Sequence, residues 1–337
     1  MRLTVIIPVY NAEKYIEESV ESVEYEFAEK AEIIIVNDGS TDSTDIICQK
    51  LKSMYSNIKY ISKCNEGVSV ARNAALSFAA GQWIMFLDAD DKIMSGASDV
   101  LKYLNDENDI LLCNYSRKDN IKEVTNIIKA DIPTDLMKKG ILNLPSYINQ
   151  ICKYSYKIDG INNWTCWAKI FRKDILDGVK FPEGVTHGED LLFCYQAYSK
   201  AKTVTFCSVN LYYYRENNES VSQKFNIRRI SNTLNLFEFF LQIDDSLINN
   251  KDFRYFVVDR TLACIKLYYA SKQNKMPFKE KKIELRELLK RDVINDSINK
   301  CSLHKLSISR KRSILNGIVL ILIKNKMYGL GILLAKI

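Results

Sequence analysis

Short apolar runs alternate with amphipathic segments through the first hundred residues, and this alternation constrains the fold more than any other feature of the sequence. Four runs have the length and composition of buried strands: LTVIIPV (3–9), EIIIVN (32–37), KYIS (59–62) and WIMFLD (83–88). Segments with helical periodicity follow the first three, from Ala12, from about Asp42 and over 68–80. Uninterrupted apolar strands joined by helices predict a mostly parallel sheet that is covered on both faces.

Polar residues stand at the carboxyl end of each predicted strand. They are Asn11, Asn37 and Asp38, Asn65 and Glu66, and finally Asp88 and Asp90. Ligands of parallel sheets bind beyond the carboxyl ends of the strands, so we expect these side chains to meet at one crevice. For any single residue, an ordinary helix cap or turn is the alternative.

The segment FLDADD (86–91) ends an apolar strand in three carboxylates, those of Asp88, Asp90 and Asp91. Carboxylates gathered at a strand end repel one another and need a compensating charge. A hard divalent cation that bridges to phosphate oxygens supplies it, as Mg²⁺ does with one or two carboxylates and the phosphates of a substrate. A solvated acidic turn is the alternative explanation of this motif.

Two more segments carry polar groups at strand ends. VNDGSTDST (36–44) has a Gly-containing turn that places Asp38 to accept hydrogen bonds from a base or a ribose. NEGVSVARNAA (65–75) leads into a helix with Arg72 on its first turns, which suits a diphosphate or a uracil edge, and a surface arginine is the alternative. The first strand is not followed by Gly-x-Gly-x-x-Gly, which argues against a dinucleotide dehydrogenase.

A second acidic motif lies about a hundred residues further along, in THGEDLLFCY (186–195). Glu189 and Asp190 open an amphipathic helix there. Acidic residues favour helix N-termini because of the helix dipole, so a purely structural role is one explanation. The functional explanation is general-base catalysis, in which a carboxylate takes the proton of an acceptor hydroxyl.

Five segments together resemble the family 2 glycosyltransferases, which are inverting enzymes with a Rossmann-like, nucleotide-sugar-binding GT-A fold. They occur in that family's order and approximate spacing: VIIPVYN (5–11), VNDGSTD (36–42), NEGVSVARN (65–73), FLDADD (86–91) and GEDLLF (188–193). The resemblance covers roughly residues 1–215 and leaves the C-terminal third of the chain outside it.

On the donor side, the resemblance implies that four residues line the nucleotide site, namely Pro8, Tyr10, Asp38 and Arg72. It places Asp88 on the ribose side and implies that Asp90 holds Mn²⁺ or Mg²⁺.

On the acceptor side, the resemblance makes Asp190 the catalytic base and Glu189 the neighbour that orients the acceptor or the base. Trp167 and Lys169 lie in WAKIFRKDI (167–175), which is similar to a family segment near the acceptor. The implied reaction is a single in-line displacement that turns an α-linked donor into a β-linked product.

The function implied by this resemblance is transfer of a hexosyl or N-acetylhexosaminyl group from a nucleotide-diphosphate sugar, with UDP as the default carrier. The acceptor would be a glycan or a lipid-linked oligosaccharide in the synthesis of a surface polysaccharide such as a capsule. Two alternatives remain open. One is a sugar nucleotidyltransferase, which usually begins with a Gly-rich basic loop that PVYNAEKY (8–15) lacks. The other is a catalytically idle module that binds a nucleotide sugar or scaffolds other transferases.

The second half of the chain changes character. A helix is expected near 96–104, a strand over 110–114, and two strand-like runs at 203–207 and 211–215. After about Asn226 the period is helical through 232–248, 253–272 and 279–294, with aromatic stripes that we assign to a core. We therefore predict a GT-A domain over 1–220 and an α-helical module over 221–337.

Basic residues are concentrated at the C-terminus. Of the 48 lysines and arginines, seven lie in 301–337 with no acidic residue, so the other 41 balance the 41 acidic residues. Residues 310–337 alternate cations with apolar runs shorter than the about 20 residues that a membrane span needs. We predict peripheral contact with anionic lipid through 310–337, without nucleic-acid binding. A helix packed on the enzyme or a homodimer contact is the alternative.

The nine cysteines include no Cys-x-x-Cys pair, and MRLTVIIPVYN begins the chain without a long apolar secretory segment. Both observations predict a reducing cytosol. Together with the basic C-terminal segment and the resemblance, this predicts a cytoplasmic protein that is peripheral on the inner face of the cell membrane. With only two histidines in the chain, a zinc site is not expected.

Overall fold

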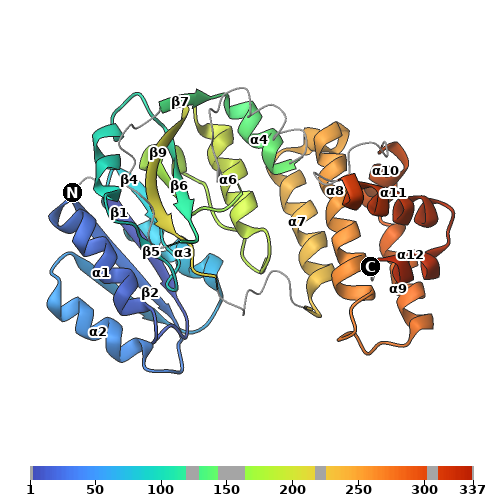
Figure 1. The fold of residues 1–337 in the computed structure, drawn as a ribbon, viewed down its shortest axis with the longest axis horizontal. Coiled ribbons are helices and arrows are strands. Elements are labelled where there is room, and N and C mark those ends of the chain that lie inside the picture. Colours follow the sequence, from blue (N-terminus) through green and yellow to red (C-terminus); the bar gives the residue numbers. More distant parts are fainter. Residues whose placement is uncertain (1–2, 119–128, 143–163, 217–224, 302–309, 336–337) are drawn as a thin grey trace. The chain divides into compact units, whose positions relative to one another are not determined.

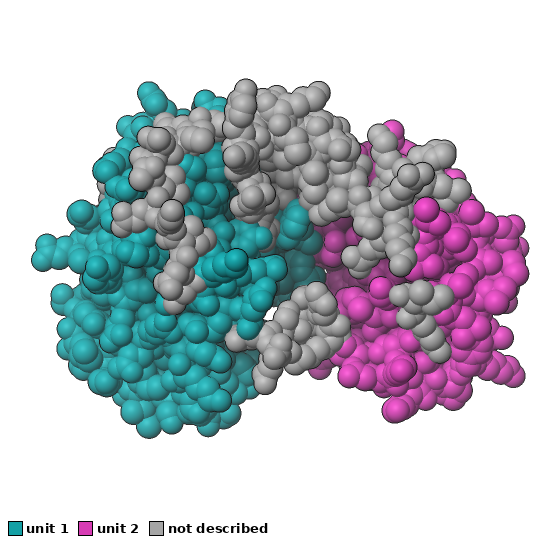
Figure 2. Space-filling view, in the orientation of Figure 1, with its two compact units in different colours: residues 1–138, 151–217 teal, residues 139–150, 218–337 magenta. Residues whose placement is uncertain are grey.

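The computed structural model describes residues 3–118, 129–142, 164–216, 225–301 and 310–335. They form two compact units (Figure 2). The first contains residues 1–138 and 151–217, and the second contains 139–150 and 218–337.

The first unit is built on a sheet whose strand order is β3-β2-β1-β4-β8-β6-β9-β5, with β7 paired to β9 (Figure 1). The four predicted strands are confirmed as neighbours and are all parallel: β1 (Leu3–Val9), β2 (Ala31–Asp38), β3 (Ile58–Lys63) and β4 (Trp83–Phe86). Their carboxyl ends therefore lie at one edge, as the sequence predicts.

The rest of the sheet is mixed. Strand β8 (Lys169–Arg172) runs antiparallel to both β4 and β6 (Ile110–Ser116), and β6 is parallel to β9 (Val204–Tyr213). The short strands β5 (Lys92–Ile93) and β7 (Lys129–Ile132) are antiparallel to β9. The two runs predicted at 203–207 and 211–215 are one strand, because register shifts after Cys113 of β6 let the pairing continue past residues 208–210.

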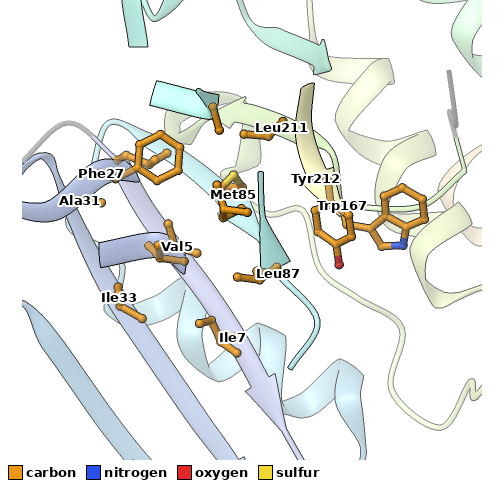
Figure 3. Close-up of a cluster of buried hydrophobic side chains, with 14 of the residues drawn as sticks. Val5, Ile7, Phe27, Ala31, Ile33, Met85, Leu87, Trp167, Leu211 and Tyr212 are labelled. Carbon is orange, nitrogen blue, oxygen red and sulfur yellow. The ribbon is translucent and has the colours of Figure 1, made fainter. Parts of the chain in front are cut away.

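Helices cover both faces of the parallel strands. On one face, Val5 and Ile7 of β1 pack in a cluster with Phe27 of α1 (Ile16–Phe27), as Figure 3 shows. On the other, Phe86 of β4 makes edge-to-face contacts with Phe181 and with Phe193 of α6 (Glu189–Lys200). Alternate β1 side chains thus enter two cores, which is why the run is apolar throughout.

Two further helices connect the parallel strands, and both begin just after a strand end. They are α2 (Thr44–Met54) and α3 (Val68–Phe78). The helix expected near 96–104 is a 3₁₀ helix over Ala97–Tyr103, and α4 (Thr134–Leu142) follows β7.

The second unit is helical. Its helices are α7 (Arg229–Ile243), α8 (Lys251–Cys264), α9 (Phe278–Leu289), α10 (Asp292–Lys300), α11 (Arg310–Lys324) and α12 (Tyr328–Leu334). A π-helical turn over Ile265–Tyr269 continues α8. The aromatic stripes do form a core, in which Phe240 contacts Phe253 and Phe256. The run predicted over 279–294 is two helices, because Arg291 has an extended backbone between them.

Among the residues that the structure describes, none of the helices combines the length and the apolar character that crossing a membrane requires.

The close approach of two strand-end turns gives a stability prediction. Gly39 has a φ of +72°, and a Cβ added there would lie 2.7 Å from the Asn65 nitrogen. Gly39→Ala should lower the free energy of unfolding by about 2–4 kcal/mol through backbone strain and the clash. Gly96→Ala is the matched control, because Gly96 has a φ of +79° with nothing within 4 Å. It should cost only about 1 kcal/mol. Equal losses in urea denaturation would contradict the proposed clash.

Candidate active site

The Arg72 guanidinium joins the two acidic motifs. Arg72 lies on α3 and is only 3% exposed. One terminal nitrogen, NH1, donates to Asp190 Oδ1 at 2.7 Å, and the other, NH2, donates to Asp88 Oδ1 at 2.8 Å. The ring of Phe181 lies against the guanidinium, 5.1 Å from its central carbon. A planar fork of donors suits this double pairing, which a lysine ammonium would not reproduce.

Asp190 is held from a second direction as well. It lies in the first turn of α6. That helix begins directly after Gly188, which has a φ of +94°. Its Oδ2 accepts a hydrogen bond from the backbone nitrogen of Cys166 at 3.2 Å, and the Cys166 thiol donates to Oδ1 at 3.4 Å. The orientation of the Asp190 carboxylate is therefore fixed by groups on two other segments, Arg72 on α3 and Cys166.

Glu189 lies beside Arg72 and Asp190, and the pKa of its carboxyl is raised. Its Oε1 lies 3.6 Å from Arg72 NH1. Burial, reinforced by repulsion from Asp190, raises the pKa of Glu189 to about 7, against the lowering effect of Arg72. Burial also raises the pKa of Asp88, although Arg72 opposes the shift. The site thus holds more carboxylates than its single buried arginine compensates.

The turn after β4 is fixed by the end of β9. The Tyr212 hydroxyl donates to Asp91 Oδ2 at 2.6 Å and accepts a hydrogen bond from the Asp88 nitrogen at 3.2 Å. Arg215 donates its backbone nitrogen to Asp91 Oδ1 and its Nε to the Asp90 carbonyl, both at 2.8 Å. Burial raises the pKa of Asp91 to about 8. The third carboxylate of FLDADD therefore anchors the turn.

Sequence reasoning missed Asp91, Tyr212 and Arg215 as site residues. The run LYYYR (211–215) predicts only a strand. The sequence feature that could have indicated these residues is a carboxylate of the acidic motif without an assigned role, together with an arginine at the end of an aromatic strand.

Asp90 is the carboxylate of this turn at which the sequence predicts a cation. Asp88 is paired with Arg72 and Asp91 with Tyr212, and the side chains of Asp88 and Asp90 are both partly exposed. Within the described parts of the chain, no three His, Cys, Asp or Glu side chains are arranged to hold a metal ion by themselves. A single carboxylate that shares a divalent cation with substrate phosphates is the arrangement these residues fit.

Asp38 holds the turn that leads into α3, and its contact with a nucleotide stays a prediction. It is 4% exposed and accepts hydrogen bonds from Lys63 Nζ at 2.8 Å, the Glu66 nitrogen at 3.0 Å and the Gly67 nitrogen at 2.7 Å. Burial alone would raise the pKa of Asp38, but these donors lower it below its usual value. The carboxylate thus fixes the turn that leads into α3 and Arg72.

The predicted gathering of polar strand-end residues holds for some of them. Asn11 donates its backbone nitrogen to Ser40 Oγ at 2.9 Å and accepts from the Thr41 nitrogen at 2.8 Å, which joins the turns after β1 and β2. Asn37 contacts the same turn, because its Oδ1 accepts a hydrogen bond from the Ser40 nitrogen at 3.0 Å. Its side-chain nitrogen donates to the Tyr60 hydroxyl at 2.9 Å and to Asp45 on α2.

The other predicted donor residues differ in exposure. Pro8 is buried in β1, opposite Val36 of β2, and Tyr10, just beyond β1, is 52% exposed. An exposed aromatic ring at a strand end is available to stack on a base. Arg72 is enclosed behind its two carboxylates, so its contact with a nucleotide stays a prediction.

Both predicted acceptor-side residues are buried. Trp167 stacks on Tyr212 and Tyr214, with ring centroids 4.8 Å and 5.5 Å away. Lys169 is fully buried, donates from Nζ to the Thr165 carbonyl at 2.5 Å, and has a pKa lowered by burial. They flank the segment whose Cys166 amide holds Asp190. Their contact with an acceptor stays a prediction.

Comparison with known proteins identifies the family of the chain. The sequence profile described as Glycosyl transferase family 2 matches residues 4–175, about half of the chain. The chain belongs to this family and is a glycosyltransferase.

Among its relatives, EpsH of Bacillus subtilis is 28% identical over 272 residues, which cover 78% of this chain and 76% of EpsH. The uncharacterized glycosyltransferase YibD of Escherichia coli is 30% identical over 66% of this chain and 63% of YibD. A crystal structure of S. aureus TarS 1–349 in complex with UDP-GlcNAc superimposes with a TM-score of 0.64, at 21% identity, covering 100% of this chain and 91% of TarS 1–349. The predicted GT-A fold followed by a helical region is confirmed.

The double pairing of Arg72 predicts a pH-dependent loss of stability on its removal. Arg72→Met leaves Asp88 and Asp190 uncompensated, at 30% and 16% side-chain exposure, and should lower the free energy of unfolding by about 2–3 kcal/mol at pH 8. Arg72 opposes the raised pKa of Asp88, so without Arg72 that pKa rises further in the folded state and stability falls as pH rises through the raised value. The deficit should therefore be smaller at pH 5 in urea denaturation.

The matched control is Arg172→Met. Arg172 also bridges two aspartates, Asp109 at 2.8 Å and Asp174 at 2.7 Å, but it is 26% exposed, and the buried Asp109 keeps its hydrogen bonds from the Lys202 and Thr203 nitrogens without it. Its loss should be about 1 kcal/mol or less. An Arg72→Met deficit that is the same at both pH values, or no larger than that of the control, would contradict the proposed role.

Proposed function

We propose that this glycosyltransferase moves a sugar from a nucleotide-diphosphate sugar, with UDP as the carrier, to a hydroxyl of a glycan or lipid-linked acceptor in surface-polysaccharide synthesis. The observation that carries the proposal is the Arg72 bridge, which sets the acidic turn after β4 and the Asp190 carboxylate on opposite ends of one guanidinium. Support for the donor and the process comes from relatives. TarS has been crystallised with UDP-GlcNAc, and GgaA of Bacillus subtilis, 31% identical over 69% of this chain, is a minor teichoic acid biosynthesis protein.

The reaction that we assign to the site is a single displacement. Asp190 takes the proton of the acceptor hydroxyl as its oxygen attacks the anomeric carbon. The bond from that carbon to the diphosphate oxygen breaks at the same time, and the nucleoside diphosphate leaves with the electron pair. Attack from the opposite side inverts the anomeric configuration. Arg72 and the Cys166 amide keep the Asp190 carboxylate oriented for this transfer.

A divalent cation, Mn²⁺ or Mg²⁺, belongs to this proposal at Asp90. When bound, it neutralises negative charge on the leaving diphosphate. The chain contributes the partly exposed Asp90 carboxylate, and the contacts of Arg215 and Tyr212 keep the turn that carries it in place.

Donor binding is tested by thermal stabilisation with a panel of nucleotide-diphosphate sugars, with and without Mn²⁺. We expect a Mn²⁺-dependent rise in melting temperature with UDP-sugars, because a ligand that binds only the folded state stabilises it. Asp90→Ala should lose the Mn²⁺-dependent part. Asp190→Asn should keep the shift and lose transfer by about 10²- to 10⁴-fold. NMR of the product should show a β-linkage from an α-linked donor.

Three results would contradict the proposal. No shift with any donor would remove the nucleotide-sugar site. A shift in the wild type without transfer to any of a broad acceptor panel would favour an idle binding module. A product with retained configuration would contradict the single displacement.

The raised pKa of Glu189 gives a pH prediction. Below about pH 7 this carboxyl is protonated, and its charged form is no longer present to orient the acceptor or the base. We therefore expect kcat/KM to rise with pH through about 7. Glu189→Gln should abolish the inflection near pH 7. At higher pH it should lower kcat/KM by about tenfold, because one positioning interaction is lost. Glu183→Gln, at an exposed position upstream of α6, is the control and should keep the profile. An unchanged inflection in Glu189→Gln would assign the titration to another group.

A further inference from the structure

A groove of about 1120 Å³ lies in the second unit, between α9 and the segment that joins α11 to α12. Figure 1 shows these helices close to one another, and α12 packs on both α9 and α11. Six cations line the groove: Lys279, Lys282, Arg286, Lys290, Lys324 and Lys326. Among the residues that the structure describes, no acidic side chain lines it.

The helical period of α9 explains this separation of charge. Lys279, Lys282, Arg286 and Lys290 recur at intervals of three or four residues and so share one face of the helix. The glutamates of α9 fall on another face, where Glu284 and Glu287 line a different cavity. A helix with both signs of charge in its sequence thus presents only cations to the groove.

Most of these cations have no carboxylate partner. Lys290 pairs with Glu287 at 2.7 Å. Within the described ranges, the other five cations of the groove make no ion pair. Five like charges around one hollow repel one another, so an anion that enters the groove gains all of their attraction.

Apolar side chains of the same groove are unusually exposed. Ile283 is 54% exposed, Met327 45% and Leu330 46%. A soluble polyanion would gain nothing from these side chains. A bilayer matches both features, because its phosphate headgroups meet the cations while apolar side chains enter the boundary with the acyl chains.

We propose that this groove, lined by the cationic face of α9 together with Lys324, Lys326, Met327 and Leu330, docks the protein on a bilayer containing anionic phospholipid. The cations contact headgroup phosphates, and Ile283, Met327 and Leu330 insert below them. The inference replaces a contact made by the C-terminal segment alone with a surface to which α9 contributes most of the charge. It does not depend on the transfer reaction proposed above.

The test is flotation of the full-length chain with vesicles of phosphatidylcholine alone or with 30 mol% phosphatidylglycerol, roughly the anionic content at which each cation contributes appreciably. The groove variant is Lys282→Gln with Arg286→Gln and Lys326→Gln. The matched control is Lys251→Gln with Lys266→Gln and Lys272→Gln, which removes the same charge from exposed positions outside the groove.

We expect binding only to the anionic vesicles. The partition coefficient of the groove variant should fall about 100-fold, because each of the three cations removed raises binding to an anionic surface about fivefold. The control should lose less than about threefold. Ile283→Ser with Leu330→Ser should lose about tenfold while keeping its charge.

Four outcomes would overturn the proposal: equal recovery from both kinds of vesicle, equal losses in the groove and control variants, no effect of the Ile283→Ser and Leu330→Ser pair, or complete displacement from vesicles by soluble polyphosphate at matched ionic strength. The last two would assign the groove to a soluble polyanion. All variants should keep the wild-type melting temperature and its shift with nucleotide, which separates failure of the groove from failure of the donor site.

Discussion

The site depends on one buried positive charge. Arg72 pairs at once with Asp88, which follows β4, and with Asp190, which opens α6 more than a hundred residues later in the chain. Each carboxylate makes burial of the guanidinium acceptable, and the guanidinium in turn lets the two carboxylates lie close together. The turn after β4 and the start of α6 are thereby fixed relative to α3, which is what a displacement between donor and acceptor requires.

Much of the first unit could be predicted, because its parallel strands are buried on both faces and therefore read as uninterrupted apolar runs. The failures have equally physical causes. Strand β8 has only the four residues Lys169–Arg172, and Lys169 is charged, so no run of the required length exists. Strand β9 continues through residues 208–210, which include the polar Ser208 and Asn210, because β6 shifts its register beside it. The non-helical backbone at Arg291 splits the run over 279–294 into two helices. It could not be predicted, because no glycine or proline stands there.

For the site, motif order was informative and contacts were not. The sequence singled out Asp88, Arg72 and Asp190 separately, but their pairing depends on how α3 and α6 pack, which no local pattern records. It also grouped Asp91 with the carboxylates that a cation would compensate, whereas Tyr212 and Arg215 hold it by hydrogen bonds. Partners so distant in sequence become neighbours only through the sheet.

The two units differ in how they arrange charged side chains, and the difference follows from their architecture. At the sheet edge, strand ends bring carboxylates together from separate segments, and a buried arginine has to neutralise them. In α9, the sequence mixes lysine, arginine and glutamate, and the helical period separates them onto different faces. From composition alone, α9 would be expected to be a solvent-exposed helix whose lysines and arginines pair with its own glutamates. Because spacing rather than content decides which charges meet, the cationic groove could be recognised only once α9 was seen beside the segment between α11 and α12.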